Sequence, residues 1–474
     1  MYSYANKRIK IDEESPRIRT GDFGEILHSY TPEQAILEAK RCNQCLIPFC
    51  AEACPIAQDA RGYVGLISEG KFDEAAQMIL QANPLATSLC KSCYHYCETA
   101  CIRGNRALPV AIRHLKRSAL EYGRSDLSYA PQAPLHLKIA VIGGGPAGIM
   151  AAWELGIRGY TVTVFEQDEL LGGQMGAIPR YRLDGSELDT DVARLRNLDV
   201  TFLRGQKSGV DFTPETLLQD GYEAVYVAIG TSAHRDLKVP GEELPGVYPA
   251  LEFLKDTNRG LNVPVGKRVV VIGGGDVAMD AARTAKRLTQ GGEVIVAYRR
   301  SREEMPAEKE EVHETETEEV PFLFLHAPLR IIGKGHVEGI VMQKLKLGPP
   351  DASGRRAPVP IPGSEVTIAC DAVISSVGQI PDLAGFSKKF DLTVGSQGAP
   401  EGKGTGFATG VEGVFASGGK SIVFAMAAAS RAAEQIDLYV SQKHGLSPHP
   451  RPDPFGGPQP VPRPSGFEGA SWHF

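Results

Sequence analysis

The sequence lacks several features that would assign it to a familiar class of protein. No uninterrupted apolar stretch reaches the length of a membrane-spanning helix, and the polar N-terminus, MYSYANKRIKIDEESPR, has no signal-peptide core. We therefore expect a cytoplasmic protein with no membrane span. The net charge of -6 is spread along the chain, so nothing indicates a nucleic-acid partner. No pattern of serine, histidine and aspartate points to a side-chain nucleophile, and we expect no catalytic side chain.

Cysteine is nearly absent outside one region of this 474-residue chain, whose length predicts two to four domains. Eight of the nine cysteines lie between Cys42 and Cys101, and Cys370 stands alone, where a buried core position is expected. A reducing compartment disfavours disulfides, so a local group of thiols indicates metal binding. The two groups are Cys42-x2-Cys45-x4-Cys50-x3-Cys54-Pro55 and Cys90-x2-Cys93-x3-Cys97-x3-Cys101.

The spacing of these thiols favours iron–sulfur clusters. A four-cysteine run that ends in Cys-Pro is similar to the bacterial ferredoxin run, with a longer middle gap. Eight thiolates suffice for two [4Fe-4S] clusters. Two zinc sites are the alternative, although zinc ribbons usually present separate C-x2-C pairs. His95 lies inside the second group and is expected to be a bystander.

A glycine-rich turn follows the apolar run 139–142, which predicts a buried strand. Gly143, Gly145 and Gly148 have the spacing G-x-G-x-x-G, and a helix and a second strand, 161–165, follow. The first glycine permits a tight turn, the second lets the backbone approach a pyrophosphate, and the third lets the helix pack close to the strand. Glu166 comes 23 residues after Gly143, where an acid can accept from ribose hydroxyls. The stretch 137–167 therefore predicts a dinucleotide-binding unit.

A second unit of the same kind begins at Arg268. Gly273, Gly275 and Ala278 have the spacing G-x-G-x-x-A, and the following strand, 294–298, ends in Arg299 and Arg300. Arginine forks suit a 2′-phosphate at this position, although adenine stacking or a plain surface pair is the alternative. Two such units predict two nucleotide-binding domains.

The remaining segments divide the chain. Thr31 and Pro32 predict a helix start, and further helices are predicted at 72–81, 109–122 and 424–440. Strands are predicted at 225–229, 373–377 and 413–417. Eight prolines lie between Pro448 and Pro464, so we predict a disordered tail at 442–474, with an extended docking arm as the alternative.

Taken together, the chain resembles the glutamate synthase small-subunit family over about residues 25–440. That family includes the N-terminal part of dihydropyrimidine dehydrogenase and the large subunit of electron-bifurcating transhydrogenases. The motifs that carry the resemblance are CNQCLIPFCAEACP (42–55), CYHYCETAC (93–101), VIGGGPAGIMAA (141–152), GGQMGAIPRYRL (172–183), VIGGGDVAMDAARTA (271–285), YRRSREEMPA (298–307), SVGQIPD (376–382) and GVFASGG (413–419).

The resemblance implies an α/β protein in which an N-terminal α-helical iron–sulfur domain precedes two Rossmann-like domains. The second of these is inserted into the first, as in thioredoxin reductase. FAD is expected in the first of these domains. Either NADH or NADPH, abbreviated NAD(P)H, is expected in the second. The expected limits are 1–125 for the iron–sulfur domain, 126–240 and 386–441 for the FAD-binding domain and 241–385 for the NAD(P)-binding domain.

The resemblance also implies interleaved clusters, one held by Cys42, Cys45, Cys50 and Cys101 and the other by Cys54, Cys93 and Cys97. The family's fourth ligand to the second cluster falls at Lys116, a poor ligand, so Cys90 is expected to replace it. The alternative is that Cys90 is a small buried residue and that His95, Lys116 or water completes the site. The family's Gly-Asp near the FAD phosphates is Gly418-Gly419 here. The other predicted cofactor contacts are Pro146, Ala147, Gln167, Gly172, Gly173, Gln174, Arg182, Gly230, Thr231, Asp276, Val277 and Gly378.

The function implied is electron transfer. Hydride would pass between NAD(P)H and FAD, and single electrons between FAD and the two clusters. The acceptor is expected to be a protein partner: a glutamate synthase large subunit, a 2-oxoacid oxidoreductase, a hydrogenase module or ferredoxin. The alternative is a redox-sensing or scaffold protein with a zinc-bound cysteine domain.

Overall fold

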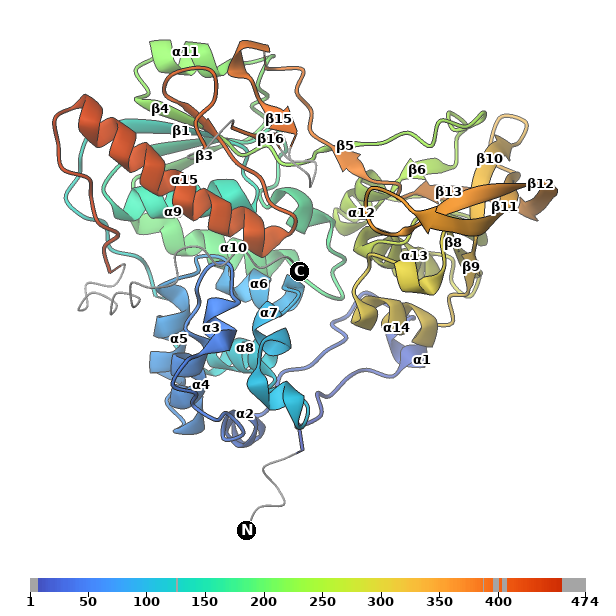
Figure 1. Cartoon of the computed structure of the whole chain (residues 1–474), viewed down its shortest axis with the longest axis horizontal. Helices are drawn as coiled ribbons and strands as arrows, with labels where there is room; N and C mark the ends of the chain where they lie inside the picture. Colours follow the sequence, from blue (N-terminus) through green and yellow to red (C-terminus); the bar gives the residue numbers. More distant parts are fainter. Residues whose placement is uncertain (1–6, 125–126, 387, 395–399, 403–406, 454–474) are drawn as a thin grey trace.

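The computed structural model describes residues 7–124, 127–386, 388–394, 400–402 and 407–453. Three bodies are visible in Figure 1: a helical body at the bottom, a sheet flanked by helices above it, and a second sheet-containing body on the right. The predicted fold class is confirmed, because a helical cysteine region precedes two α/β units with parallel sheets. None of the described helices is both long and apolar enough to cross a membrane.

The helical body contains all eight clustered cysteines. The predicted start at Thr31 is confirmed: its hydroxyl accepts from the Gln34 amide, the Gln34 side chain caps the Thr31 amide in return, and Pro32 is the first helical residue. The elements are α2 (Pro32–Ala39), α3 (Phe49–Glu52), α4 (Ala60–Ser68), α5 (Phe72–Leu80), α6 (Ala86–Ser92), α7 (Tyr96–Thr99), the 3-10 turn η1 (Ile102–Asn105) and α8 (Ile112–Tyr122).

The first α/β unit is a five-stranded parallel sheet in the order β17-β4-β1-β2-β3. Its strands are β1 (Lys138–Ile142), β2 (Thr161–Phe165), β3 (Val200–Leu203), β4 (Ala224–Val227) and β17 (Val414–Ala416). Its helices and 3-10 turns are α9 (Pro146–Ile157), η2 (Gly173–Ala177), α10 (Gly185–Ala193), η3 (Arg194–Asn197), α11 (Pro214–Gln219), η5 (Lys388–Phe390) and α15 (Ile422–Lys443), with a small hairpin of β15 (Thr393–Val394) and β16 (Pro400–Glu401).

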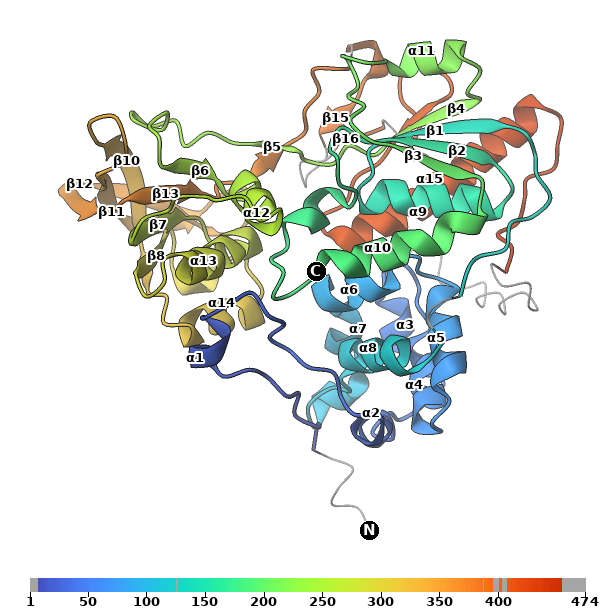
Figure 2. The ribbon, with the colours of Figure 1, turned by 180° about the vertical axis from the view of Figure 1, so that it is seen from behind.

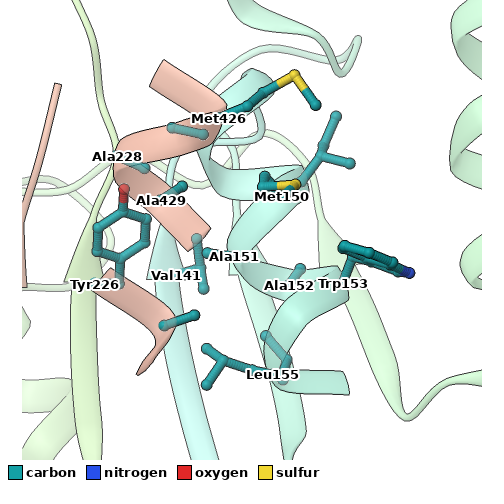
Figure 3. Close-up of a cluster of buried hydrophobic side chains, with 14 of the residues drawn as sticks. Val141, Met150, Ala151, Ala152, Trp153, Leu155, Tyr226, Ala228, Met426 and Ala429 are labelled. Atoms are coloured by element: carbon teal, nitrogen blue, oxygen red, sulfur yellow. The ribbon is translucent and has the colours of Figure 1, made fainter. Parts of the chain in front are cut away.

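Helices α9 and α15 lie side by side over this sheet and bury its main core. Figure 3 shows Met150 and Trp153 of α9 with Met426 and Ala429 of α15, above Tyr226 of β4. Trp153 is fully buried. Alanines on the facing sides of both helices let them approach closely, so the glycine turn before α9 is held on a rigid support.

The second α/β unit interrupts the first between β4 and β17. Its parallel sheet has the order β6-β13-β7-β8-β9, and an antiparallel sheet, β10-β11-β12, stands beside it. Its elements are β6 (Val247–Pro249), α12 (Ala250–Asn258), β7 (Arg268–Ile272), α13 (Asp276–Leu288), β8 (Glu293–Tyr298), η4 (Arg302–Glu304), α14 (Lys309–Thr317), β9 (Phe322–Phe324), β10 (His326–Ile332), β11 (Gly339–Pro350), β12 (Arg356–Ala369) and β13 (Ala372–Ser375). Cys370 is buried in its core, as predicted.

The chain enters and leaves this second unit through one two-stranded link. Strand β5 (Ala233–His234) pairs antiparallel with β14 (Gln379–Ile380), so the two crossings lie side by side. The link joins the two α/β units, and the helical body lies below the first of them (Figure 1).

An N-terminal arm joins the helical body to the second α/β unit. Figure 2 shows it running from α2 to α1 (Pro16–Arg19), which lies beside α14. The guanidinium of Arg19 is buried there, 3.0 Å from Glu318 and 2.5 Å from Glu314. Farther along the arm, the Ile26 amide donates to the Tyr181 carbonyl. The arm therefore contacts more than one body.

The predicted tail is docked over its first residues. Helix α15 continues to Lys443, and the segment after it lies against α9 and α15: the His449 amide donates to Asp437, and Arg451 lies 4.8 Å from the centre of the Trp153 ring. Arg451 also donates to the Gln81 carbonyl of the helical body. Of the expected tail, residues 442–443 belong to α15, and the contacts of 444–453 fit the alternative of an extended docking arm. Residues 454–474 lie outside the described part of the chain.

Candidate site at the junction of the three bodies

The first glycine turn combines two glycines that the chain itself requires with one at which a Cβ would make only an ordinary contact. Gly143 has a φ of +110°, and a Cβ there would lie 2.6 Å from the Ala228 carbonyl. A Cβ on Gly148 would lie 1.8 Å from the Gly143 carbonyl. A Cβ on Gly145 would meet nothing closer than the Gly173 Cα at 3.8 Å. Helix α9 begins just after Gly145, so the free amides of its first turn lie beside this glycine. Such an arrangement suits a pyrophosphate.

The acid at the end of β2 holds the turn in shape. One oxygen of Glu166 accepts from the Gly144 amide at 2.6 Å, and the other accepts from the Asp168 amide at 2.8 Å. Burial raises the pKa of Glu166, while these two amides act in the opposite direction. Each carboxylate oxygen keeps a second lone pair, so the carboxylate can still accept from a ribose hydroxyl.

The second glycine turn repeats the same design. A Cβ on Gly273 would lie 2.5 Å from the Ser376 carbonyl, and Ala278 is fully buried under the turn. A Cβ on Gly275 would meet only Pro306, at 3.9 Å. Helix α13 begins at Asp276, so its first amides face the space beside Gly275. The two turns therefore offer two separate sites for a diphosphate.

The two arginines after β8 have different roles. Arg300 is buried: its Nε donates to the Arg356 carbonyl at 2.8 Å, and its Nη2 lies 2.5 Å from Asp351. It therefore holds the β11–β12 hairpin, which is not the cofactor contact predicted for it. Arg299 is exposed at the end of β8. Of the pair, Arg299 is the side chain available to a 2′-phosphate.

The first set of thiols lines one pocket. Cys42, Cys45, Cys50 and Cys101 face it together, and apolar residues supply most of the rest of its wall: Pro48, Phe49, Ala60, Val64, Ala100, Ile102, Val110 and Ile112. Burial raises the pKa of Cys50 to about 11, and Cys42 and Cys101 raise it as well because they are close. Four thiols around one largely apolar pocket are a donor set suited to an iron–sulfur cluster.

A second set of thiols lies toward the first α/β unit. Burial raises the pKa of Cys97 well above its usual value, and the nearby Glu98, Cys54 and Cys93 add to the shift. Cys54 and Cys93 also pack against the core of the first α/β unit. No three histidine, cysteine, aspartate or glutamate side chains in the described ranges are close enough together to hold a single metal ion.

Cys90 is not brought to this second set. Its thiol donates to the Thr87 carbonyl at 3.0 Å, one turn back in α6, and its side chain is buried in the core of the helical body. Burial raises the pKa of Cys90 to about 11, and the charges that lower it are those of Lys116, Arg117 and Lys91. The geometry does not support the expected role of Cys90 as a ligand. Lys116 also lowers the pKa of Cys93 against the effect of burial, so this lysine places a positive charge near the second set.

The segment between Cys93 and Cys97 touches both α/β units. The Tyr94 hydroxyl donates to Asp276, at the start of α13, at 2.6 Å. The Tyr96 ring lies 5.4 Å from the Phe424 ring in the first turn of α15. Sequence reasoning missed both contacts, because they join residues more than 180 positions apart and no local pattern marks them.

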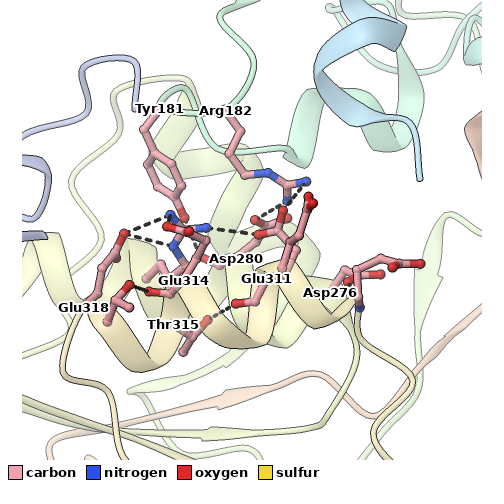
Figure 4. Close-up of polar contacts among 12 residues, drawn as sticks. Tyr181, Arg182, Asp276, Asp280, Glu311, Glu314, Thr315 and Glu318 are labelled. Carbon is pink, nitrogen blue, oxygen red and sulfur yellow. Dashed lines mark hydrogen bonds and ion pairs between the residues drawn. The ribbon is translucent and has the colours of Figure 1, made fainter. Parts of the chain in front are cut away.

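Arg182 lies at the boundary between the α/β units. Its guanidinium is 2.6 Å from Asp280 of α13 and 2.9 Å from Glu311 of α14 (Figure 4). The neighbouring Tyr181 ring lies 4.0 Å from the Arg287 guanidinium. Arg182 was expected along the flavin, but the structure engages it in holding the second unit against the first.

Gln174 gathers three predicted segments at the two-stranded link. Its side-chain amide donates to the Thr231 carbonyl at 2.9 Å and to the Gln379 side chain at 3.1 Å. Gln379 was not predicted, although Gly378 beside it was. The turn before Gln174 also packs on the first glycine turn, since a Cβ on Gly173 would lie 3.1 Å from the Gly145 Cα.

The remaining predicted contacts lie around these turns. Those in the first turns of α9 and α13 are Pro146, Ala147 and Val277. Two of the remaining predicted contacts, Gly172 and Gly230, are glycines with a positive φ. Gln167 is exposed just after β2. Gly418 and Gly419 precede α15, and a Cβ on Gly419 would lie 2.3 Å from the Ala425 amide nitrogen.

Comparison with known proteins divides the chain in the same way. The pyridine nucleotide-disulphide oxidoreductase family model matches residues 137–435, and the model for dihydropyrimidine dehydrogenase domain II, 4Fe-4S cluster, matches residues 19–127. The Mycobacterium tuberculosis protein FprA in complex with NADPH has a TM-score of 0.56 at 21% identity over 65% of this chain and 86% of that chain, a likeness of fold alone.

Curated relatives share more of the sequence. The NADP(+)-dependent formate dehydrogenase subunit beta of Moorella thermoacetica is 38% identical over 427 residues, which are 83% of this chain and 60% of that subunit. The glutamate synthase [NADPH] small chain of Halomonas elongata is 34% identical over 86% of this chain and 90% of its own length. The Escherichia coli small chain is 33% identical over 91% and 96%. The chain thus spans less than two thirds of the Moorella subunit but nearly all of the two small chains.

Proposed function

This chain belongs to the glutamate synthase small-subunit family of pyridine nucleotide-disulphide oxidoreductases, and we propose that it carries electrons from NADPH to a protein partner by way of FAD and two [4Fe-4S] clusters. The observation that carries the proposal is the contact of the second set of thiols and its neighbours with both α/β units, through Cys54 and Cys93 against the core of the first unit and through Tyr94 at the start of α13. When bound, the nucleotides supply hydride transfer and the clusters supply single-electron transfer.

The first glycine turn binds FAD in this proposal. Gly145 leaves room for the pyrophosphate, and the first amides of α9 face it. Glu166 orients the turn through the Gly144 amide and accepts from a ribose hydroxyl with its remaining lone pairs. Gln174 and Thr231 close the side of this site that faces the second unit.

The second glycine turn binds the nicotinamide nucleotide. Gly275 and the first amides of α13 hold the pyrophosphate, as in the first turn. NADPH is favoured over NADH because the exposed Arg299 lies at the end of β8, where a 2′-phosphate is recognised. The names of the formate dehydrogenase and glutamate synthase relatives also specify NADP(+) or NADPH.

The thiols hold the clusters. Cys42, Cys45, Cys50 and Cys101 supply a complete set for one cluster. Cys54, Cys93 and Cys97 supply three ligands for the other, and its fourth ligand is a group other than Cys90. The match of residues 19–127 to a 4Fe-4S domain supports iron–sulfur clusters rather than zinc.

The electron acceptor is a protein that binds this chain. The relatives are named as subunits or chains of larger enzymes, and the chain covers 60% of the formate dehydrogenase subunit. A partner subunit or a ferredoxin therefore completes the reaction.

The test is anaerobic analysis of the reconstituted full-length chain. We expect about eight irons and one FAD per chain, because two four-iron clusters are proposed. NADPH should bleach the flavin absorbance. Cys45→Ser should remove about half of the iron and leave FAD bound, whereas stoichiometric zinc, or four irons in the unmodified chain, contradicts the proposal.

A further inference from the structure

Large apolar side chains are exposed in the two segments of the helical body that line the first thiol pocket. We call this the pocket face; it consists of Leu46, Ile47, Phe49, Ile102 and Leu108. Leu46 is 93% exposed and Leu108 is 62% exposed. They come from two segments, 42–50 and 101–109, that meet at the pocket, where Phe49 and Ile102 are part of its wall. Exposed apolar groups gathered in this way mark interaction surfaces.

Within the two segments that form the pocket face, the charged side chains are all positive, while Glu52 and Asp59 are exposed in the neighbouring stretch 51–61. Segments 42–50 and 101–109 contain no aspartate or glutamate but include Arg103 and Arg106, although the chain as a whole has a net charge of -6. Arg61 lies beside them: its guanidinium donates to the carbonyls of Cys45 and Leu46. Arg103 donates to the Asn43 side chain across the pocket mouth. Two of the three guanidiniums are therefore held next to the apolar residues.

We propose that the pocket face docks an acidic one-electron carrier protein whose redox centre lies beneath an apolar patch of its own. The inference rests on the function proposed above. The arginines would steer the acidic carrier to the face, and the apolar residues would exclude water where the two redox centres approach most closely. Each NADPH oxidised to NADP⁺ and H⁺ releases two electrons, so two oxidised carriers each gain one electron in successive encounters.

Two substitutions test the face without altering a proposed ligand. Leu46→Glu and Leu108→Glu each add a negative charge at a side chain that is mostly exposed. Val210→Glu is the matched control, because Val210 is 76% exposed but belongs to the first α/β unit. The probe is an acidic [4Fe-4S] ferredoxin, and its Kd for the full-length holoprotein is measured by calorimetry at several salt concentrations. Reduction of the ferredoxin by NADPH is measured in parallel.

The unmodified chain should bind ferredoxin more weakly as salt rises. Each pocket-face variant should raise the Kd about tenfold and slow ferredoxin reduction, while Val210→Glu should not. Bleaching of the flavin by NADPH should be unchanged in all three variants. Iron content is checked first, and if Leu46→Glu loses iron, Leu108→Glu decides the result.

Two binding results overturn the inference: no ferredoxin binding at low salt, or equal Kd values for the unmodified chain and the Leu108→Glu variant. A change in the molar mass of the protein in solution on substitution also overturns it, because the face would then be a contact between copies of this chain. Failure of the proposed function is a separate result, because it would appear as an unreduced flavin whatever the Kd for ferredoxin.

Discussion

Gly275 offers a direct test of the second glycine turn, because the structure separates its role from that of Gly273 two positions earlier. We expect Gly275→Val to abolish NADPH binding while the fold and bound FAD remain. The added Cβ would meet only Pro306, at 3.9 Å, and the backbone angles of φ -98° and ψ 176° suit a branched residue. The side chain would instead fill the opening that faces the first amides of α13.

The expected magnitudes differ widely between folding and binding. For Gly275→Val the free energy of unfolding should change by less than about 0.5 kcal/mol, since no contact is broken. A pyrophosphate kept from two backbone amides loses two charge-assisted hydrogen bonds, about 3–6 kcal/mol together. That loss corresponds to a Kd for NADPH raised at least about 100-fold.

The assay compares Gly275→Val with Gly273→Ala, which alters the same turn. A Cβ at Gly273 would lie 2.5 Å from the Ser376 carbonyl, so this variant should lose stability by about 2 kcal/mol or more. The measurements are urea unfolding, flavin content and fluorescence titration with NADPH. Flavin loss with intact NADPH binding in Gly275→Val would show that the two turns are assigned the wrong way round, and binding within a factor of three of the unmodified chain would refute the role of the opening.

Three further substitutions separate roles that the sequence left together. Cys90→Ser should retain both clusters, since a serine hydroxyl can also donate to the Thr87 carbonyl; loss of either signal in electron paramagnetic resonance of the reduced protein would make Cys90 a ligand after all. Arg299→Ala should raise the KM for NADPH about tenfold or more and leave the KM for NADH unchanged. Arg300→Ala should lower the melting temperature, because the β11–β12 hairpin loses the bonds of Arg300 to Asp351 and to the Arg356 carbonyl. The reverse pattern in steady-state kinetics and thermal unfolding would contradict both assignments. Asp191→Ala should lower the free energy of unfolding, measured in urea, by about 3–5 kcal/mol, because it leaves the buried Arg194 guanidinium without this carboxylate. A change below about 1 kcal/mol would show that this ion pair contributes little to stability.

Asp191 also illustrates why the helical body and the first α/β unit are joined firmly. It lies in α10, yet its carboxylate accepts from the amides of Thr87 and Ser88 in the first turn of α6, at 3.0 and 2.8 Å. Figure 2 shows α10 directly above α6. A carboxylate at a helix N-terminus is stabilising, so one side chain connects the two bodies through a helix end.

Features that depend on neighbouring residues could be predicted from the sequence. Thr31 and Pro32 begin a helix as expected, because a cap requires groups only three residues apart. The two glycine turns follow their strands as expected, because strand, turn and helix are contiguous in the sequence, although the carbonyls that exclude a side chain at Gly143 and Gly273 belong to the distant Ala228 and Ser376. The order of the three bodies was predicted as well, because the motifs occur in the order typical of the family.

Features that depend on distant residues were decided only by the tertiary structure. Cys90 has the spacing of a ligand, but its position in α6 directs the thiol to Thr87 and into the helical core, away from the other cysteines. Arg182 and Arg300 lie within cofactor motifs, yet each bonds a carboxylate that packing brings from 51 or more residues away. The contact of Tyr94 with Asp276 joins two bodies across 182 residues. Local patterns record the backbone conformation that a segment adopts, whereas the partner of a long charged or polar side chain depends on how the folded bodies pack together.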